Sequence, residues 1–149
     1  MRKLSEDERR GFQESVKRIY GVENYLDEYV LVKAGDGRVR VCTAEAFETA
    51  SILRKVVSVG VYAAKWRDWG VVLTIEGSNL LKSRPPNVFE LERDEALMWM
   101  DGAPLRLEGW KGEKIVLGSF HGFLLGAALV GRDGIAYPQI PKWRRIHGE

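Results

Sequence analysis

The chain has 149 residues, with 23 Lys and Arg against 21 Asp and Glu, which gives a formal net charge of +2. Its 45% hydrophobic and 30% charged residues are typical of a soluble globular protein and exclude an intrinsically disordered chain. The nearly balanced charge also excludes a protein that coats nucleic acid, so binding to nucleic acid would require positive charge clustered on one surface.

The residue inventory argues against a membrane segment, a disulfide and a metal cluster. The longest apolar runs, such as 123–130, are too short to span a bilayer, and no apolar signal segment follows the first residues; we therefore expect a cytoplasmic protein with no membrane partner. The single Cys42 excludes an internal disulfide, and we expect it to be buried. His121 and His147 are far apart and have no ligand motif around them, so we expect no metal and no other cofactor.

The first half of the chain is predicted to combine helices with antiparallel strands. Ser5 and Glu8 stand in capping-box spacing at the start of a helix that Gly21 ends. Gly60, inside a strand, indicates a close backbone approach or a bulge. The predicted elements, in chain order, are a helix at 5–19, a hairpin at 29–33 and 38–42, a helix at 43–55 with a buried stripe of Ala46, Phe47, Ala50 and Leu53, strands at 57–64 and 71–74 with a polar turn at 65–70 between them, and a short helical turn at 75–81.

The second half is predicted to form short strands around one helix. The segment 82–87 contains two adjacent prolines, which favour extended backbone and break helices and central strands, so we place a domain boundary there, between residues 1–84 and 85–149. The elements expected beyond it are strands at 88–91, 104–107, 114–118, 122–130 and 134–137 and a helix at 92–100 that buries Trp99. This pattern predicts an α+β protein whose second domain is a small β-barrel.

Six motifs follow one another in this second half. They are Asp94–Trp99, Asp101–Gly102, Lys111–Leu117, Ser119–Val130, Tyr137–Pro138 and Pro141–Ile146. In this order, residues 86–146 resemble the PUA-like RNA-binding domain of the Nop/Sun family of RNA 5-methylcytosine methyltransferases and their archaeal relatives. The resemblance implies a PUA-like β-barrel. It also implies that the first half is an N-terminal α/β domain like the pre-PUA domain of the two-domain Nip-seven-type ribosome-biogenesis proteins.

The sequence departs from this family at two places. Ala127–Ala128 stands where the family has glycine-lysine, which removes one basic contact, and 137–142 stretches the family's compact tyrosine-proline-lysine element. In PUA domains the RNA lies against the helix and the loop that follows it. The resemblance therefore implies that Asp101–Gly102 and Arg106 lie near the RNA.

The inventory does not support an enzyme. The related methyltransferases need an adenosylmethionine loop on a doubly wound sheet and two cysteines, whereas this chain has one cysteine and no room for that fold. The Gly-x-Gly at 35–37 lies between two strands, which is typical of a hairpin turn rather than a nucleotide loop. Ser119 and His121 share a strand face but have no orienting acid nearby in sequence, and the strained strand-to-helix turn that exposes a nucleophile is missing.

The residues of this chain suit RNA binding better than catalysis, because RNA binding needs cations for phosphates and flat rings for bases. The candidate RNA-contacting residues are Lys142, Trp143, Arg144 and Arg145 in the tail, Lys65 and Arg67 in the aromatic turn, Lys82 and Arg84 at the boundary, and Arg106, His121 and Tyr137 in the barrel. The alternatives are a tail whose Trp143 packs on the barrel, a turn whose tryptophans are buried, and a Tyr137 that packs in the core or at an edge.

These observations predict non-catalytic binding of structured RNA, tRNA or rRNA, in RNA modification or ribosome biogenesis. The alternative is a protein-interaction adapter that docks on an RNA methyltransferase or a ribosomal protein, with the basic tail incidental. The near-neutral net charge is the best support for that alternative.

Overall fold

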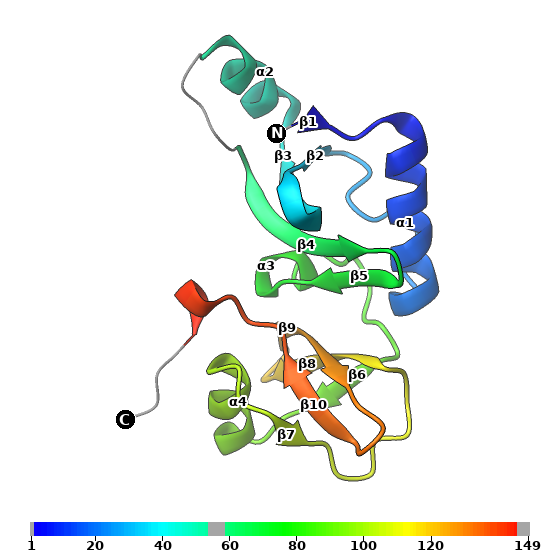
Figure 1. Ribbon diagram of the computed structural model, residues 1–149, viewed down its shortest axis with the longest axis vertical. Helices are drawn as coiled ribbons and strands as arrows, with labels where there is room; N and C mark the ends of the chain where they lie inside the picture. Colours follow the sequence, from blue (N-terminus) through cyan, green and yellow to red (C-terminus); the bar gives the residue numbers. More distant parts are fainter. Residues whose placement is uncertain (1, 54–58, 146–149) are drawn as a thin grey trace.

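The computed structural model, which describes residues 2–53 and 59–145, has an α+β fold. Within these residues it contains four α-helices and two five-stranded sheets, which lie one beyond the other along the long axis (Figure 1). One sheet curls into a half-barrel, which is compatible with the predicted small barrel. In the described part of the chain, no helix is both long enough and apolar enough to cross a membrane.

The first sheet is antiparallel throughout, in the order β1-β2-β3-β4-β5. Its strands are β1 (Arg2–Lys3), β2 (Val30–Lys33), β3 (Arg38–Cys42), β4 (Val61–Arg67) and β5 (Gly70–Leu73). The predicted hairpin is confirmed: β2 pairs with β3, and Cys42 is buried as expected. The structure limits the turn expected at 65–70 to two residues, because β4 extends through Arg67 and pairs with β5.

Helix α1 (Glu6–Tyr20) packs against this sheet beside β5. Its predicted start and end are confirmed, since Ser5 and Glu8 form both halves of a capping box and Gly21 closes the helix with φ 71°. The Tyr20 side chain is fully buried, and its hydroxyl donates a 2.7 Å hydrogen bond to the carbonyl of Val71. Burial raises the pKa of this phenol far above its ordinary value, so it remains a neutral donor that ties α1 to β5.

Helix α2 (Ala44–Ile52) differs from its predicted packing. Thr43 caps it as expected, but only Ala50 of the expected stripe is buried, and Leu53 is 55% exposed. The helix projects beyond the end of the first sheet (Figure 1), so little of the described part of the chain covers its apolar side. The last predicted helical residues, 54–55, and the start of the next predicted strand, 57–58, lie outside the described residues.

Gly60 makes the close backbone approach that its place in the sequence indicated. Its φ is 82°, and a Cβ built on it would lie 2.3 Å from the carbonyl oxygen of Val41. Only glycine accommodates both this dihedral angle and this contact, which bring the start of β4 against the end of β3.

The second sheet has the order β6-β8-β9-β10-β7. Its strands are β6 (Val88–Glu90), β7 (Leu105–Arg106), β8 (Ile115–Phe120), β9 (Phe123–Val130) and β10 (Ile135–Pro138); β6 runs parallel to β8 and the other pairs are antiparallel. Helix α4 (Arg93–Met100) fills its core with Trp99, which is fully buried as predicted and donates its indole N–H to the carbonyl of Leu125 at 3.0 Å. Ala127 and Ala128 are buried, so neither position presents a side chain to solvent.

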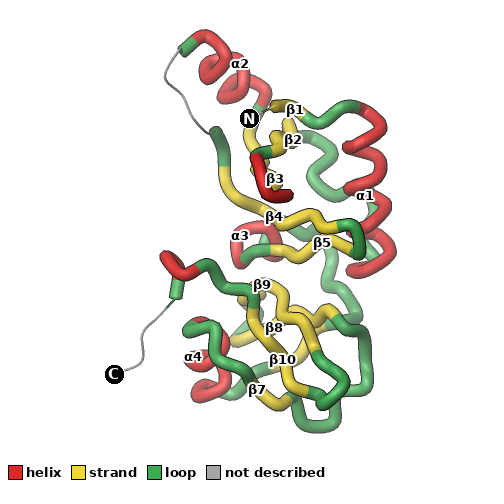
Figure 2. The backbone as a smooth tube through the Cα atoms, in the orientation of Figure 1, coloured by secondary structure: helices red, strands yellow, loops and turns green. Residues whose placement is uncertain are grey.

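A short helix, α3 (Ile75–Ser78), connects the two sheets (Figure 2). The Asn79 amide that follows it donates to the carbonyl of Leu124 at 2.8 Å and accepts from the amide of the same residue at 3.2 Å. One apolar cluster contains residues of both sheets, with Val39 and Leu73 from the first and Leu117 and Leu124 from the second. Buried contacts therefore cross residue 84, and the division of the chain into two domains stays a prediction.

Candidate functional site

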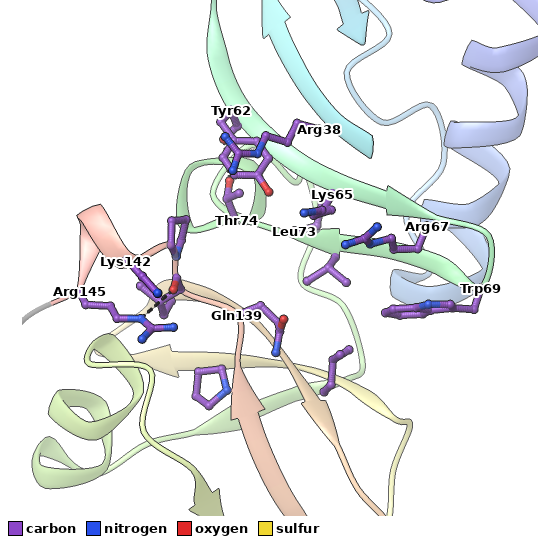
Figure 3. A pocket seen from close by; sticks show the side chains of 15 residues that line it. Arg38, Tyr62, Lys65, Arg67, Trp69, Leu73, Thr74, Gln139, Lys142 and Arg145 are labelled. Carbon is purple, nitrogen blue, oxygen red and sulfur yellow. Dashed lines mark hydrogen bonds between the residues drawn. The ribbon is translucent and has the colours of Figure 1, made fainter. Parts of the chain in front are cut away.

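A basic cleft lies where β3, β4 and β5 face the C-terminal segment 138–145 (Figure 3). Its volume is about 450 Å³, and its walls comprise 15 residues. The cations among them are Arg38, Lys65, Arg67, Lys142 and Arg145, and none of the 15 is acidic. The cleft thus concentrates positive charge that the net charge of +2 conceals.

A β-bulge in β4 points the side chains of one wall into the cleft. Val39 pairs with Ala64 and Arg40 with Tyr62, which leaves Ala63 as an extra residue between them. An extra residue reverses the alternation of side chains along a strand, so Tyr62 and Lys65 reach the same face although they are three positions apart. Arg67, two residues beyond Lys65, faces the cleft as well.

Arg38 and Lys65 are directly opposed across the β3–β4 pair. Two like charges in this position repel each other and destabilise a sheet. Arg38 is partly compensated, since its Nε lies 3.6 Å from Asp36 Oδ1 and its guanidinium lies 5.5 Å from the centre of the Tyr62 ring. An anionic ligand between the two cations would remove the remaining repulsion.

Most of the cationic charge in the cleft is available to a ligand. Within residues 2–53 and 59–145, none of Lys65, Arg67, Lys142 and Arg145 forms an ion pair. Arg145 is nevertheless held in place, because its Nε donates to the carbonyl of Ile140 at 3.0 Å. A Cβ on Gly102 would lie only 2.8 Å from that Nε, so Arg145 connects the cleft to the loop that follows α4.

Two aromatic side chains complete the cleft. Tyr62 is half-buried, and burial raises its pKa against a smaller lowering by Arg38, so its phenol is neutral at physiological pH. Trp69, at the β4–β5 turn, is 53% exposed. The two tryptophans of the segment predicted as an aromatic turn, 65–70, therefore have different surroundings. Trp66 packs edge-on against Phe12 with ring centroids 5.6 Å apart, and Trp69 faces solvent.

Three of the predicted RNA-contacting cations form ion pairs with carboxylates. Lys82 pairs with Glu28 at 3.0 Å, Arg84 with Glu90, and Arg144 with Glu76 at 2.8 Å. The side chains of Lys82 and Arg84 hold the pKa values of Glu28 and Glu90 below their ordinary value. Lys142 and Arg145 of the tail therefore join Lys65 and Arg67, whereas the boundary cations do not.

The remaining predicted residues lie outside the cleft lining. Trp143 is 67% exposed, so the alternative in which it packs on the barrel is wrong. Arg106 donates to the carbonyl of Asp133 at 2.8 Å, and Tyr137, on β10, is 43% exposed. His121 occupies the β8–β9 turn with φ 49° and lies against Phe120, with ring centroids 4.2 Å apart.

The sequence did not identify four polar residues that line the cleft, Arg38, Tyr62, Thr74 and Gln139. Arg38 stands at the start of a predicted strand, and only its pairing with Lys65 places it in the site. Gln139 belongs to the stretched 137–142 segment, whose departure from the family pattern was the available signal.

The hydroxyl of the candidate nucleophile Ser119 is inaccessible to a substrate, because the residue is fully buried. His121 lies in an exposed turn. Among the described residues, no three His, Cys, Asp or Glu side chains are grouped so that they could hold a metal ion. His147 lies outside the described residues.

Comparison with protein-family models finds no match to this chain, and comparison with curated protein sequences finds none either. The resemblance to PUA-like domains therefore stays a prediction.

Proposed function

We propose that this protein binds structured RNA, tRNA or rRNA, in RNA modification or ribosome biogenesis, and that it catalyses no reaction itself. In this proposal an N-terminal α/β pre-PUA-like domain, residues 1–84, precedes a PUA-like barrel, residues 85–149. The observation that carries the proposal is the basic cleft, with five cations and no carboxylate among its lining residues.

The cleft suits a polyanion better than a small acid. Lys65 and Arg67 lie on one wall and Lys142 and Arg145 on the other, so the cations are spread along the cleft rather than focused on one point (Figure 3). A phosphodiester backbone offers a series of negative charges that matches this spread, and phosphate contacts supply most of the affinity of such interfaces.

The link from Arg145 to Gly102 also supports RNA. The family resemblance implies RNA beside the helix and its following loop, which here are α4 and residues 101–102. Because Arg145 lies against Gly102 and also lines the cleft, one bound strand can contact both places.

A salt titration tests the proposal. The wild-type chain, mixed with tRNA and with rRNA fragments, is expected to bind with an affinity that falls steeply as salt rises, because RNA phosphates release counterions when cations bind them. Absence of binding to either RNA at low salt would overturn the proposal.

One observation favours the adapter alternative. An apolar groove of about 450 Å³ runs between α4 and the β8–β9 turn. In it, Leu97 is 50% exposed and Phe123 is 70% exposed, more apolar surface than isolated side chains provide. If the groove holds an RNA-modifying enzyme or a ribosomal protein, Leu97→Glu will abolish association with that purified partner and leave RNA affinity unchanged.

A further inference from the structure

We propose that the basic cleft takes an unpaired RNA nucleotide whose base stacks on Trp69, so that the protein prefers single-stranded or bulged RNA to a continuous duplex. This inference rests on the proposed function and names the class of RNA that the cleft selects.

Trp69 differs from the tryptophans that stabilise the fold. Trp66 packs on Phe12 and lies under the Lys33 ammonium at 5.6 Å, and Trp99 is fully buried. Trp69 lines the basic cleft and also a neighbouring hollow of about 660 Å³, whose charged border residues are Arg18, Lys114 and Glu113. Its indole therefore stands between two open spaces, each flanked by cations.

The position of Trp69 is fixed by the backbone around it. It is the second residue of a two-residue turn between β4 and β5, where Arg67 pairs with Gly70. Gly70 is buried, and a Cβ there would lie 2.7 Å from the Cδ1 of Ile19, so the turn packs tightly on α1. The backbone that carries the Trp69 ring is therefore held in place before RNA binds.

The size of the cleft and the chemistry of stacking point to an unpaired base. A cavity of about 450 Å³ is within the range of small-molecule sites, the scale of a nucleotide and not of a helix. In a duplex the bases are stacked on one another inside the helix, whereas bases of loops, bulges and ends can be splayed out onto aromatic rings. An exposed ring flanked by phosphate-binding cations can therefore stack with an unpaired base, which a continuous duplex does not offer.

Gln139 supplies a polar group for the edge of that base. It is exposed on the opposite wall, and its amide nitrogen donates to the carbonyl of Tyr137 at 2.8 Å. This bond orients the amide, and within the described residues its oxygen has no hydrogen-bond donor. The oxygen can accept a hydrogen bond from an exocyclic amino group of a base.

Binding of two labelled RNAs tests the inference. One is a single strand of about ten nucleotides, within the site sizes of single-strand binders, and the other is the same strand paired with its complement. Trp69→Ala is expected to weaken binding of the single strand about 5- to 150-fold, the range for losing one stacked base, and to change duplex binding less than about twofold. Trp69→Phe, which keeps a ring, should retain most of the affinity. Phe123→Ala, which removes an exposed aromatic ring outside the cleft lining, should have no effect.

The outcomes separate the inference from the proposed function. Equal losses on single strand and duplex, or no loss with Trp69→Ala, would overturn the inference while salt-dependent RNA binding upheld the proposed function. If the wild-type chain binds tRNA or rRNA fragments but neither labelled RNA, the inference is overturned and the proposed function stands. If it binds none of these RNAs at low salt, both are overturned.

Discussion

Removing one cation from each wall of the cleft should lower the salt dependence of RNA binding. Lys65→Ala combined with Lys142→Ala deletes charges that have no ion-pair partner among the described residues. The fold should tolerate both changes, because Lys142 is exposed and the loss of Lys65 relieves its opposition to Arg38.

The magnitude follows from the number of cations. If each of the five binds one phosphate of a single strand, the slope of log affinity against log salt is roughly −3.5, at about 0.7 per contact. Affinity then falls about 100-fold between about 50 mM and about 200 mM salt. With three cations left, the slope becomes roughly −2.1, and the same change in salt costs about 20-fold.

The assay is fluorescence anisotropy of a labelled RNA over a series of salt concentrations. The matched control is Lys111→Ala with Arg132→Ala, which removes two exposed charges outside the cleft lining and should leave the wild-type slope unchanged. If both double variants show the same slope, RNA phosphates do not bind the cations of the cleft. That result would refute the prediction.

Two further predictions concern stability. Gly60→Ala should lower the free energy of unfolding by at least roughly 1–3 kcal/mol, the cost of a left-handed backbone at a non-glycine residue. The loss should be larger still, because the new methyl group meets the carbonyl oxygen of Val41. Chemical denaturation measures the loss, and a value no larger than that of Gly35→Ala, where the space around the glycine is open, would contradict the prediction. A hydrogen bond from Arg2 lowers the pKa of Glu8 well below its ordinary 4.5, so Glu8 stabilises the fold above pH 4.5 and loses this contribution as pH falls through the lowered pKa. Glu8→Gln should therefore be less stable than wild type at neutral pH, with the difference shrinking in acid; a difference in unfolding midpoint that is independent of pH would refute this.

Local sequence signals predicted most of the elements, because their causes are local. The capping box of Ser5 and Glu8, the β2–β3 hairpin and the buried Trp99 of α4 depend on neighbouring residues or on the period of one helix or strand. The packing of α2 was predicted less well. The exposure of Leu53 depends on how far the first sheet extends beneath the helix, and no local pattern states this.

Which residues line the cleft depends on long-range contacts, and no local pattern in the sequence states these. Lys82, Arg84 and Arg144 read as free cations in the sequence, but Glu28, Glu90 and Glu76 neutralise them after folding. The bulge at Ala63 and the pairing of Arg38 with Lys65 likewise arise from strand register. The sequence therefore identifies the basic and aromatic residues, whereas the tertiary structure determines which of them lie close together.

The central claim, that RNA occupies the basic cleft, is tested most directly by photo-crosslinking. A 4-thiouridine-substituted single-stranded RNA would be irradiated with the wild-type chain and the crosslinked peptides sequenced by mass spectrometry. If RNA lies in the cleft, crosslinks form in two separate segments, one containing Trp69 at the β4–β5 turn and one within 138–145. Crosslinks confined to the apolar groove beside α4, around Leu97 and Phe123, would contradict it.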